Sequence, residues 1–260
     1  MPVADPTQRF SSRVDNYVRY RPGYPPEVLE LLKTDCGLTP SSVIADIGSG
    51  TGILTRIFLE NGNRVFGVEP NEDMRRAGEG LLAGYPQFTS VAGSAEATTL
   101  RDRSVDMVTA AQAAHWFERE AARREFLRIL KPGAWTVLLW NERKTDSTPF
   151  LREYEKLLLT YGTDYEDVRH ERTTTAIDGF FAPAPDQVRV FDMHQEFDYP
   201  ALEGRLLSSS YTPQPGHPKY RPMLKELQQS GREDRGRRGQ DQLRRVGRWA
   251  RKENWPQRIG

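Results

Sequence analysis

Short apolar runs alternate with amphipathic segments through the first half of the chain. Runs of β-branched residues predict strands, and apolar residues at helical spacing predict helices between them. Because strands that alternate with helices need crossover connections, this pattern indicates an α/β fold with a largely parallel sheet. The predicted strands are 42–47, 64–69, 88–92, 104–110 and 135–140, and the helices between them are 51–61, 71–83 and 118–130.

The flanking segments carry weaker patterns. On the amino-terminal side we expect a disordered start over 1–10 and helices over 11–20 and 27–32. The alternation weakens after residue 145, where turn-rich segments separate fewer elements. There we expect a helix over 149–161, a sixth strand over 188–199 and a short helix over 223–229.

A glycine-rich turn between the first strand and its helix is the most informative stretch. The strand ends in Asp46, and Gly48, Gly50 and Gly52 follow at every second position. A chain that leaves a strand and enters a helix at once must turn sharply, and glycine reaches the required dihedral angles without strain. The missing Cβ atoms let a ligand touch the backbone, and the amides at the helix start favour a polar or anionic group.

A carboxylate ends the second predicted strand. Glu69 lies seventeen residues after Gly52 and could accept hydrogen bonds from a ribose diol. The two strand ends together describe a nucleotide-like cofactor lying across the edge of a parallel sheet. The dinucleotide fingerprint is not met, because Ile53 stands where Gly-x-Gly-x-x-Gly requires glycine. An ordinary glycine turn explains the loop alone, but not its combination with Asp46 and Glu69.

The Gly-x-Gly-x-Gly spacing after an acidic residue resembles motif I of class I S-adenosylmethionine (AdoMet)-dependent methyltransferases. Glu69 falls where the ribose-binding acid of that family lies. The resemblance covers about residues 10–225 and implies AdoMet as the cofactor. It implies cofactor contacts for Asp46, Gly48, Ser49, Gly50, Gly52, Glu69 and Pro70.

The loop after the third strand, residues 93–96, resembles the segment that cups the adenine in this family. The resemblance implies that Ser94 contacts the exocyclic amine and that the Ala95 amide contacts a ring nitrogen. The family often has Asp where Ser94 stands, and serine weakens the first contact. A plain polar turn is the alternative.

The loop after the fourth strand carries His115, Trp116 and Phe117. This run resembles a small-molecule subgroup that includes trans-aconitate methyltransferase-like proteins, and its position implies that it faces the sulfonium and the acceptor. His115 is our catalytic candidate, as a base or as a donor that orients a carboxylate, and Trp116 is a substrate candidate. A base matters only if the acceptor must lose a proton. The alternative is a histidine that only shapes the loop, whereas Gln112 is expected to line the cofactor channel.

Two further segments supply candidates. The phrase from Tyr20 to Pro25 resembles the amino-terminal cap of the subgroup, which implies that Arg21 reaches the methionine carboxylate with its forked donors. Tyr17 in the same cap, and Ser210 and Tyr211 in the late insertion, are substrate candidates. Simple aromatic packing in the cap, and a helix end followed by a proline turn in the insertion, explain the same residues.

On this resemblance we divide the chain into four parts. We expect a Rossmann-like, doubly wound and mostly parallel sheet with helices on both faces. The parts are cap helices over 1–36, the AdoMet-binding core over 37–145, an insertion with the acceptor pocket and a late strand over 146–230, and a basic tail over 231–260.

The tail differs in charge from the rest of the chain. It holds ten Lys and Arg residues against four Asp and Glu, a net charge of +6, while the first 230 residues hold 27 basic and 32 acidic residues, a net charge of −5. Its apolar residues show no strand alternation. A solvated, disordered tail is the favoured interpretation. The alternative is a nucleic-acid-binding arm that uses Trp249 and Trp255 for stacking.

The family resemblance suggests a third interpretation of the tail. Methyltransferases of this class usually end in an antiparallel strand beside the fifth strand, and nothing after Gly231 matches one. An abrupt Arg- and Gly-rich ending is what a shifted reading frame in a GC-rich gene would produce. This hypothesis predicts an unpaired sheet edge and weakened stability.

Composition narrows the setting. Cys36 is the only cysteine, which excludes an internal disulfide and suits a reducing cytosol, so we expect a cytoplasmic protein. No apolar run predicts a secretory signal or a membrane span. The four histidines lack metal-ligand spacing, and we predict no metal site. The expected partner is a small-molecule acceptor rather than nucleic acid or membrane, and the expected state is a monomer or homodimer.

Together these features predict transfer of the AdoMet methyl group to an oxygen, or less favourably a nitrogen, of a small molecule. The His115–Phe117 resemblance favours a small carboxylic acid as the acceptor. The alternatives are a non-catalytic protein that binds AdoMet or a nucleotide, and a nucleic-acid-binding protein that uses the basic tail.

Overall fold

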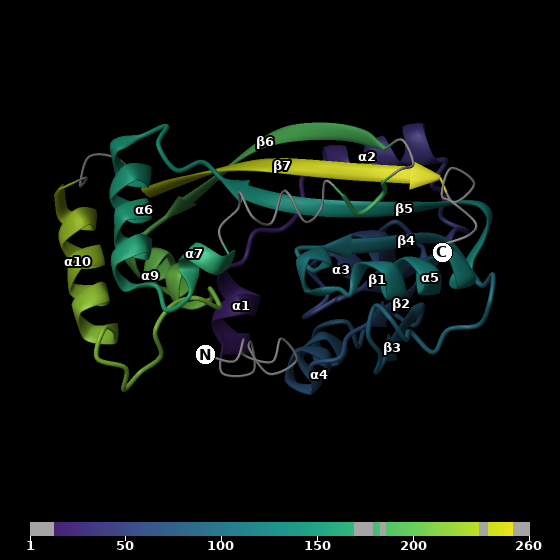
Figure 1. Cartoon of the computed structure of the whole chain (residues 1–260), viewed down its shortest axis with the longest axis horizontal. Coiled ribbons are helices and arrows are strands. Elements are labelled where there is room, and N and C mark those ends of the chain that lie inside the picture. Colours follow the sequence, from purple (N-terminus) through teal and green to yellow (C-terminus); the bar gives the residue numbers. More distant parts are fainter. Residues whose placement is uncertain (1–12, 169–178, 183–185, 234–238, 252–260) are drawn as a thin grey trace.

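A single seven-stranded sheet organises the molecule (Figure 1). The computed structural model describes residues 13–168, 179–182, 186–233 and 239–251. The predicted doubly wound sheet is confirmed, because β3, β2, β1, β4 and β5 are parallel neighbours. The strand order is β3 (Phe88–Val91), β2 (Arg64–Val68), β1 (Val43–Ile47), β4 (Val105–Ala111), β5 (Leu130–Arg143), β7 (Gly239–Arg251) and β6 (Gln187–Phe197).

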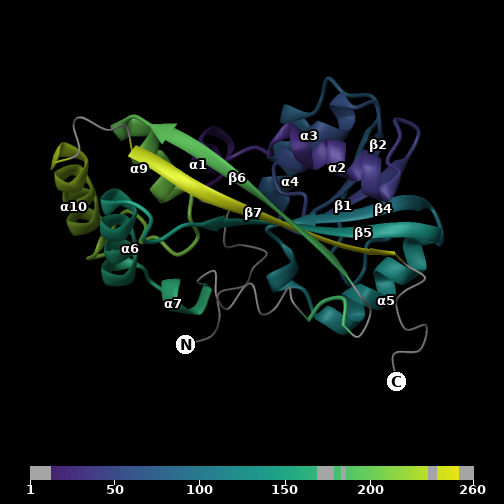
Figure 2. The ribbon, with the colours of Figure 1, turned by 90° about the horizontal axis from the view of Figure 1, so that it is seen from above.

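Helices cover both faces of the parallel half, with α2 (Pro26–Cys36) and α3 (Ile53–Glu60) on one face and α5 (Arg119–Ile129) on the other (Figure 2). Successive strand residues point to opposite faces, which fixes this partition. In β1, Ile44 packs in the cluster with α2 and α3, whereas Ala45 packs in the cluster with α5. Burial on both faces therefore explains why the central strands are almost wholly apolar.

A second group of helices lies at the far end of the long strands β5, β6 and β7 (Figures 1 and 2). It has its own core, which includes Leu157, Leu206 and Met223. The group contains α6 (Pro149–Tyr161), α7 (Tyr165–Val168), α9 (Tyr199–Leu207) and α10 (Tyr220–Glu233). Helix α4 (Glu72–Leu81) belongs instead to the parallel half.

The amino-terminal helix α1 (Val14–Tyr20) lies between the two helical groups (Figure 1). Arg13, which is 6% exposed, fixes its start by donating to Ser209 O at 2.6 Å and to Thr212 Oγ1 at 2.7 Å. At its end Tyr20 packs so closely on α9 that a Cβ on Gly204 would lie 2.0 Å from the ring. These contacts hold the cap against α9.

The prediction of a tail without a strand is wrong for residues 239–251, which form β7. This strand pairs antiparallel with β5 and with β6, so it lies inside the sheet. Its local pattern gives no strand signal, but the edges of β5 and β6 both offer unpaired backbone groups that a third strand can satisfy. The unpaired edge expected from a shifted reading frame is therefore not found at β5.

The remaining predicted elements agree in type with the structure, and their ends differ by a few residues. Strand β5 begins five residues earlier than predicted, and α9 occupies a segment for which no whole helix was predicted. The expectations for residues 1–10 and for the end of the tail after residue 251 lie outside the described residues. None of the helices in the described part of the chain is both long and apolar enough to cross a membrane.

Candidate functional site

The glycine loop between β1 and α3 turns as its sequence predicts. Gly48, Gly50 and Gly52 have φ values of 66°, 56° and 87°, which side chains with a Cβ rarely adopt. A Cβ on Gly48 would lie 2.5 Å from the Cβ of Ala113, so the loop also packs directly against the loop after β4. Glycine is therefore required at Gly48 by both conformation and space.

Asp46 ties this loop to the two elements beside it. Its carboxylate accepts from Thr55 Oγ1 on α3 at 2.6 Å and from Thr109 Oγ1 on β4 at 2.9 Å. Burial raises the pKa of Asp46 to about 6, against the opposing effect of the two threonine hydrogen bonds. Asp46 therefore fixes where β1 ends relative to α3 and β4.

Glu69 faces the glycine loop from the end of β2. Its carboxylate accepts from the Gly50 amide at 2.9 Å and from the Asn71 amide at 2.8 Å. Burial raises the pKa of Glu69, and the two backbone hydrogen bonds oppose this rise. A carboxylate has about four lone-pair sites, so two bonds fix its orientation and leave capacity for hydroxyl groups of a ligand.

A cavity of about 830 Å³, a volume that includes open solvent at its mouth, lies along these strand ends. It brings together the predicted ribose acid at the end of β2 and the predicted adenine loop that follows β3. Its described lining residues include Gly48, Gly50, Glu69, Pro70, Ser94, Ala95, Gln112, Trp116 and Tyr17. Gly52 lines neither this cavity nor the next, and instead precedes α3, where a Cβ would lie 2.6 Å from Leu82 Cδ1.

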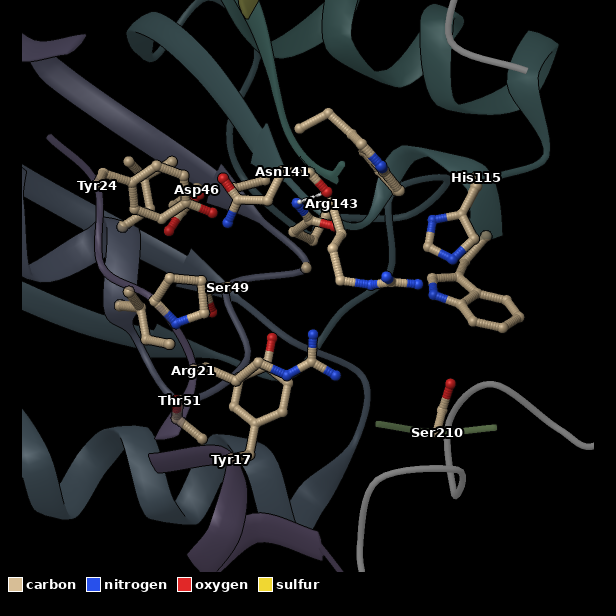
Figure 3. A pocket seen from close by; sticks show the side chains of 18 of the residues that line it. Tyr17, Arg21, Tyr24, Asp46, Ser49, Thr51, His115, Asn141, Arg143 and Ser210 are labelled. Carbon is tan, nitrogen blue, oxygen red and sulfur yellow. Dashed lines mark hydrogen bonds between the residues drawn. The ribbon is translucent and has the colours of Figure 1, made fainter. Parts of the chain in front are cut away.

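A second cavity of about 1120 Å³, a volume that again includes open solvent, adjoins the first. The two cavities share a wall, which is formed by Tyr17, Gly48, Ala111, Gln112 and Trp116. Figure 3 shows Tyr17 and Arg21 on one side of this second cavity and His115 on the other. Its other described lining residues include Asp46, Ser49, Trp140, Asn141, Arg143, Arg205, Ser210 and Tyr211.

Gln112 in the shared wall has a strained backbone. Its φ is 57°, although it is not glycine. Its amide donates to Leu139 O at 3.0 Å, and its side chain donates to Asn141 O at 3.4 Å. A non-glycine residue in this region costs about 1–3 kcal/mol and persists only where its surroundings enforce it, which is common at functional sites.

His115 lies in the short 3₁₀ turn Ala114–Trp116, between two indole rings. Its ring centroid is 4.3 Å from that of Trp116 and 4.8 Å from that of Trp140, the latter in an edge-on arrangement. Aromatic contacts on two sides hold the imidazole at the cavity wall. The turn can thus present a polar ring to a ligand inside an otherwise aromatic corner.

Residues 45–138 match the model of a family described as a methyltransferase domain. The match runs from β1 into β5 and includes the glycine loop, Glu69 and His115. This part of the chain is a class I AdoMet-dependent methyltransferase domain. AdoMet is the methyl donor typical of such domains, and the positive-φ glycines and the oriented Glu69 carboxylate fit its adenosine part.

Similarity to named proteins agrees with this assignment. The chain is 36% identical over 171 residues to an uncharacterized methyltransferase of Mycobacterium bovis, covering 65% of each chain. It is 34% identical over 150 residues to an uncharacterized methyltransferase of Schizosaccharomyces pombe, covering 57% of this chain and 58% of the relative. The matches thus span less than two thirds of these relatives.

A solved structure designated a type II methyltransferase, from Anaeromyxobacter dehalogenans, has the same fold. It superposes with a TM-score of 0.62 at 23% identity and covers 89% of this chain and 97% of that one. A likeness at this level of identity concerns the fold, and here it covers most of both chains.

The structure brings nearly all predicted site residues of the methyltransferase domain to the two cavities, and it adds others. The end of β5 contributes Trp140, Asn141 and Arg143 to the second cavity. For these residues the sequence offered only the general rule that ligands bind at the ends of strands. Arg205 on α9 also lines the cavity, and no local motif surrounds it.

Arg143 is held by a buried network in the second helical group. It donates to Glu155 Oε2 and, at 3.0 Å, to Tyr165 Oη, and its guanidinium lies 5.1 Å from the centroid of the Tyr154 ring. The Arg143 and Glu155 side chains are only 4% and 13% exposed. This ion pair fixes the arginine at the cavity wall and compensates its charge.

Proposed function

We propose that this protein transfers the methyl group of AdoMet to an oxygen of a small carboxylic acid. The observation that carries the proposal is the shared wall between the Glu69 cavity and the arginine-lined cavity. A donor in the first cavity and an acceptor in the second would meet at Gln112 and Trp116. Methyl transfer is an in-line displacement, and such an arrangement supplies its alignment.

The first cavity would hold the adenosine part of AdoMet. Glu69 would accept from the ribose hydroxyls, Ser94 and Ala95 would contact the adenine, and the Gly48–Gly50 backbone would approach the ligand closely. When bound, AdoMet supplies a methyl carbon activated by a positively charged sulfur. Asp46 would hold the glycine loop in position, because both of its carboxylate oxygens already accept hydrogen bonds from threonines.

The second cavity favours an anionic acceptor. Arg21, Arg143 and Arg205 line it, of which Arg21 would hold the methionine carboxylate of AdoMet, and Asp46 is the only carboxylate among its described lining residues. A carboxylic acid is ionised near neutral pH and needs no base to become a nucleophile. His115 would then orient the acceptor by donating a hydrogen bond, while Trp116 and Trp140 exclude water around it.

The sequence resemblance to the small-molecule subgroup supports the same acceptor class. Arg21 has forked donors suited to the methionine carboxylate and lines the cavity beside Tyr17. Ser210 and Tyr211 lie on the same cavity and would contact the acceptor. That the substrate candidates all line this one cavity supports the proposal.

A two-stage experiment tests the proposal. First, calorimetry measures the affinity of S-adenosylhomocysteine for the wild type and for Glu69→Ala. Loss of the ribose hydrogen bonds should weaken binding by about 1–3 kcal/mol, because the lost bonds involve a charged group. An unchanged affinity would remove the ribose assignment.

Second, methyl-labelled AdoMet is incubated with a panel of small acids, alcohols and amines. We expect label in methyl esters that alkali releases as methanol. Label only in amines or ethers would overturn the carboxylate assignment. Binding of S-adenosylhomocysteine without transfer to any acceptor would support the non-catalytic alternative.

A further inference from the structure

One buried arginine joins the start of the cap to the segment that follows α9. Arg13 Nη1 donates to Ser209 O at 2.6 Å and to Thr212 Oγ1 at 2.7 Å, and its Nη2 donates to Thr212 O at 2.6 Å. The same Nη1 also lies 3.2 Å from Leu207 O. Hydrogen bonds from a charged guanidinium are stronger than neutral ones, so Arg13 fixes residues 207–212 as a unit.

The place of these acceptors at the end of a helix explains why a cation suits the position. Helix α9 ends at Leu207, and the last carbonyl groups of a helix have no hydrogen-bond partner within it. A positive charge near this end also interacts favourably with the helix dipole. Arg13 therefore stabilises the end of α9 and the turn that follows it.

The 207–212 segment also forms part of the second cavity. Ser210 and Tyr211 line this cavity, and Figure 3 shows Ser210 across the opening from Tyr17. On the side of the second helical group, the Tyr211 ring lies 4.8 Å from that of Tyr165, and Tyr211 O accepts from the Thr163 amide at 2.9 Å. The segment is therefore held between that group and the cap, and Arg13 holds it on the cap side.

Helix α1 connects this segment to the proposed cofactor site. Tyr17 in α1 lines both cavities, and Arg21, which directly follows α1, would hold the methionine carboxylate of AdoMet. Arg21 Nη2 also donates to Ser208 O at 3.0 Å. Helix α1 has seven residues and is about 10 Å long, so its two ends move as one body. A ligand that fixes Arg21 therefore fixes Arg13 as well.

We propose that Arg13 is a positioning residue for methyl transfer: through α1 it makes the 207–212 wall of the second cavity depend on a bound cofactor. This inference rests on the proposed function. Arg13 is not among the described lining residues of either cavity, so it acts through the segment and not on a ligand. A cofactor that binds best when cap and segment are joined shifts the population toward that arrangement. By linkage, an acceptor that contacts Ser210 and Tyr211 binds more tightly after the cofactor than before it.

Hydrogen exchange tests the proposal without an identified acceptor. The amides of Ser208, Ser209 and Thr212 donate to carbonyl groups at 3.0, 3.0 and 3.2 Å, so their exchange rates report opening of the segment. Mass spectrometry compares the wild type with and without saturating S-adenosylhomocysteine. The ligand should slow exchange over 207–212 by about fivefold or more, the lower end of typical coupling between two sites. Exchange in the 48–52 loop, which the ligand would contact directly, reports binding itself.

Substitutions then assign the effect to Arg13. Arg13→Met keeps the apolar stem and removes the donors, so the ligand should still slow exchange in the 48–52 loop but no longer over 207–212. Arg13→Lys keeps the charge without the forked donors and should retain only part of the effect. Arg19→Met is the matched control, because Arg19 is an exposed arginine on the same helix, and we expect the full wild-type response from it.

The outcomes separate this proposal from the proposed function. A wild-type protein in which the ligand protects the 48–52 loop but not 207–212 would overturn the role of Arg13 without any variant. A full response in folded Arg13→Met would also overturn it, because the segment would then respond to the ligand directly, and so would an equal loss of response in Arg19→Met. If Arg13→Met does not fold, a full response in Arg13→Lys has the same meaning. Failure of S-adenosylhomocysteine to bind the wild type would instead contradict the proposed function.

Discussion

The two cavities that meet at Gln112 are built in different ways. The cavity that contains Glu69, the proposed cofactor-side cavity, is made mainly by turns that directly follow β1, β2, β3 and β4, and some of its hydrogen-bonded partners are close in sequence. Gly50 and Glu69, for example, are nineteen residues apart. The cavity lined by His115 and Arg143, the proposed acceptor-side cavity, joins the cap to the late helices, as in the hydrogen bond from Arg21 to Ser208, which spans 187 residues.

This difference explains where sequence motifs are informative. A turn that must accommodate positive φ and a touching ligand restricts residue types locally, and the restriction appears as a motif. A cavity wall assembled by packing needs only the right side chain at the right place, and many local sequences can supply it. Motifs therefore mark the cavity that contains Glu69, and packing forms the cavity lined by His115 and Arg143.

Removal of β7 should have the largest effect, because this strand connects β5 of the parallel half to β6. A chain ending at Glu233 lacks the strand that pairs with both β5 and β6. We expect loss of cooperative folding and aggregation through the exposed edges. Circular dichroism melting and size-exclusion chromatography measure this.

A chain ending at Arg251 is the control, because it keeps β7 whole. If the chain ending at Glu233 melted like the full chain, the strand would contribute nothing, and a solvated tail would again describe this region.

Glu155→Ala should have the next largest effect, which is a loss of stability in the second group of helices. It leaves the buried Arg143 charge without its carboxylate, which costs about 3–5 kcal/mol when one partner of a buried pair is removed. Urea unfolding gives the change in the free energy of unfolding. Glu153→Ala, an exposed position on the same helix, should change it by less than about 0.5 kcal/mol. Equal effects of both substitutions would contradict the role of the pair.

Gly48→Ala should lower the free energy of unfolding by about 2–4 kcal/mol, because the new Cβ meets Ala113 and the residue keeps a positive φ. Calorimetry should also show a loss of S-adenosylhomocysteine affinity.

Gly80→Ala is the matched control. Gly80 lies in α4, and no atom lies within 4 Å of the place that its Cβ would take, so alanine should stabilise the helix by up to about 1 kcal/mol. A tolerated Gly48→Ala would show that the loop can move away from Ala113.

The smallest expected effect is a pH dependence of cofactor affinity. The pKa of Glu69 lies above its ordinary 4.5, so the carboxylate becomes protonated at a higher pH than an exposed glutamate. Ionised Glu69 is the better acceptor for ribose hydroxyls, and its stabilising effect is present at high pH and lost as the pH falls through this raised value. We expect S-adenosylhomocysteine affinity to fall about fivefold, the difference between a charged and a neutral hydrogen bond.

Glu69→Gln should remove this component of the pH dependence while it retains Asp46, whose pKa of about 6 lies in the same range. The same slope in the wild type and in Glu69→Gln would assign the titration to Asp46 or another group. Calorimetric titrations at several pH values distinguish these outcomes.

Particular residues show how far the sequence could be used alone. Asp46, Gly48 and Glu69 follow from strand ends and turn chemistry, and their close approach was expected because parallel strands end at one edge of the sheet. Arg205 and Arg143 were missed, because neither lies in a pattern that local sequence could distinguish from an ordinary helix or strand end. β7 was missed because its partners, not its own alternation, make it a strand.

The sequence by itself determined the parallel sheet, the glycine turn and the acid that faces it, because each depends on periodicity or dihedral requirements within a few residues. Only the tertiary structure decided that β7 lies between β5 and β6 and that α1 packs on α9, because backbone pairing and side-chain packing depend on surfaces supplied by distant segments. Arg21 and Arg205 line one cavity as a consequence of that packing.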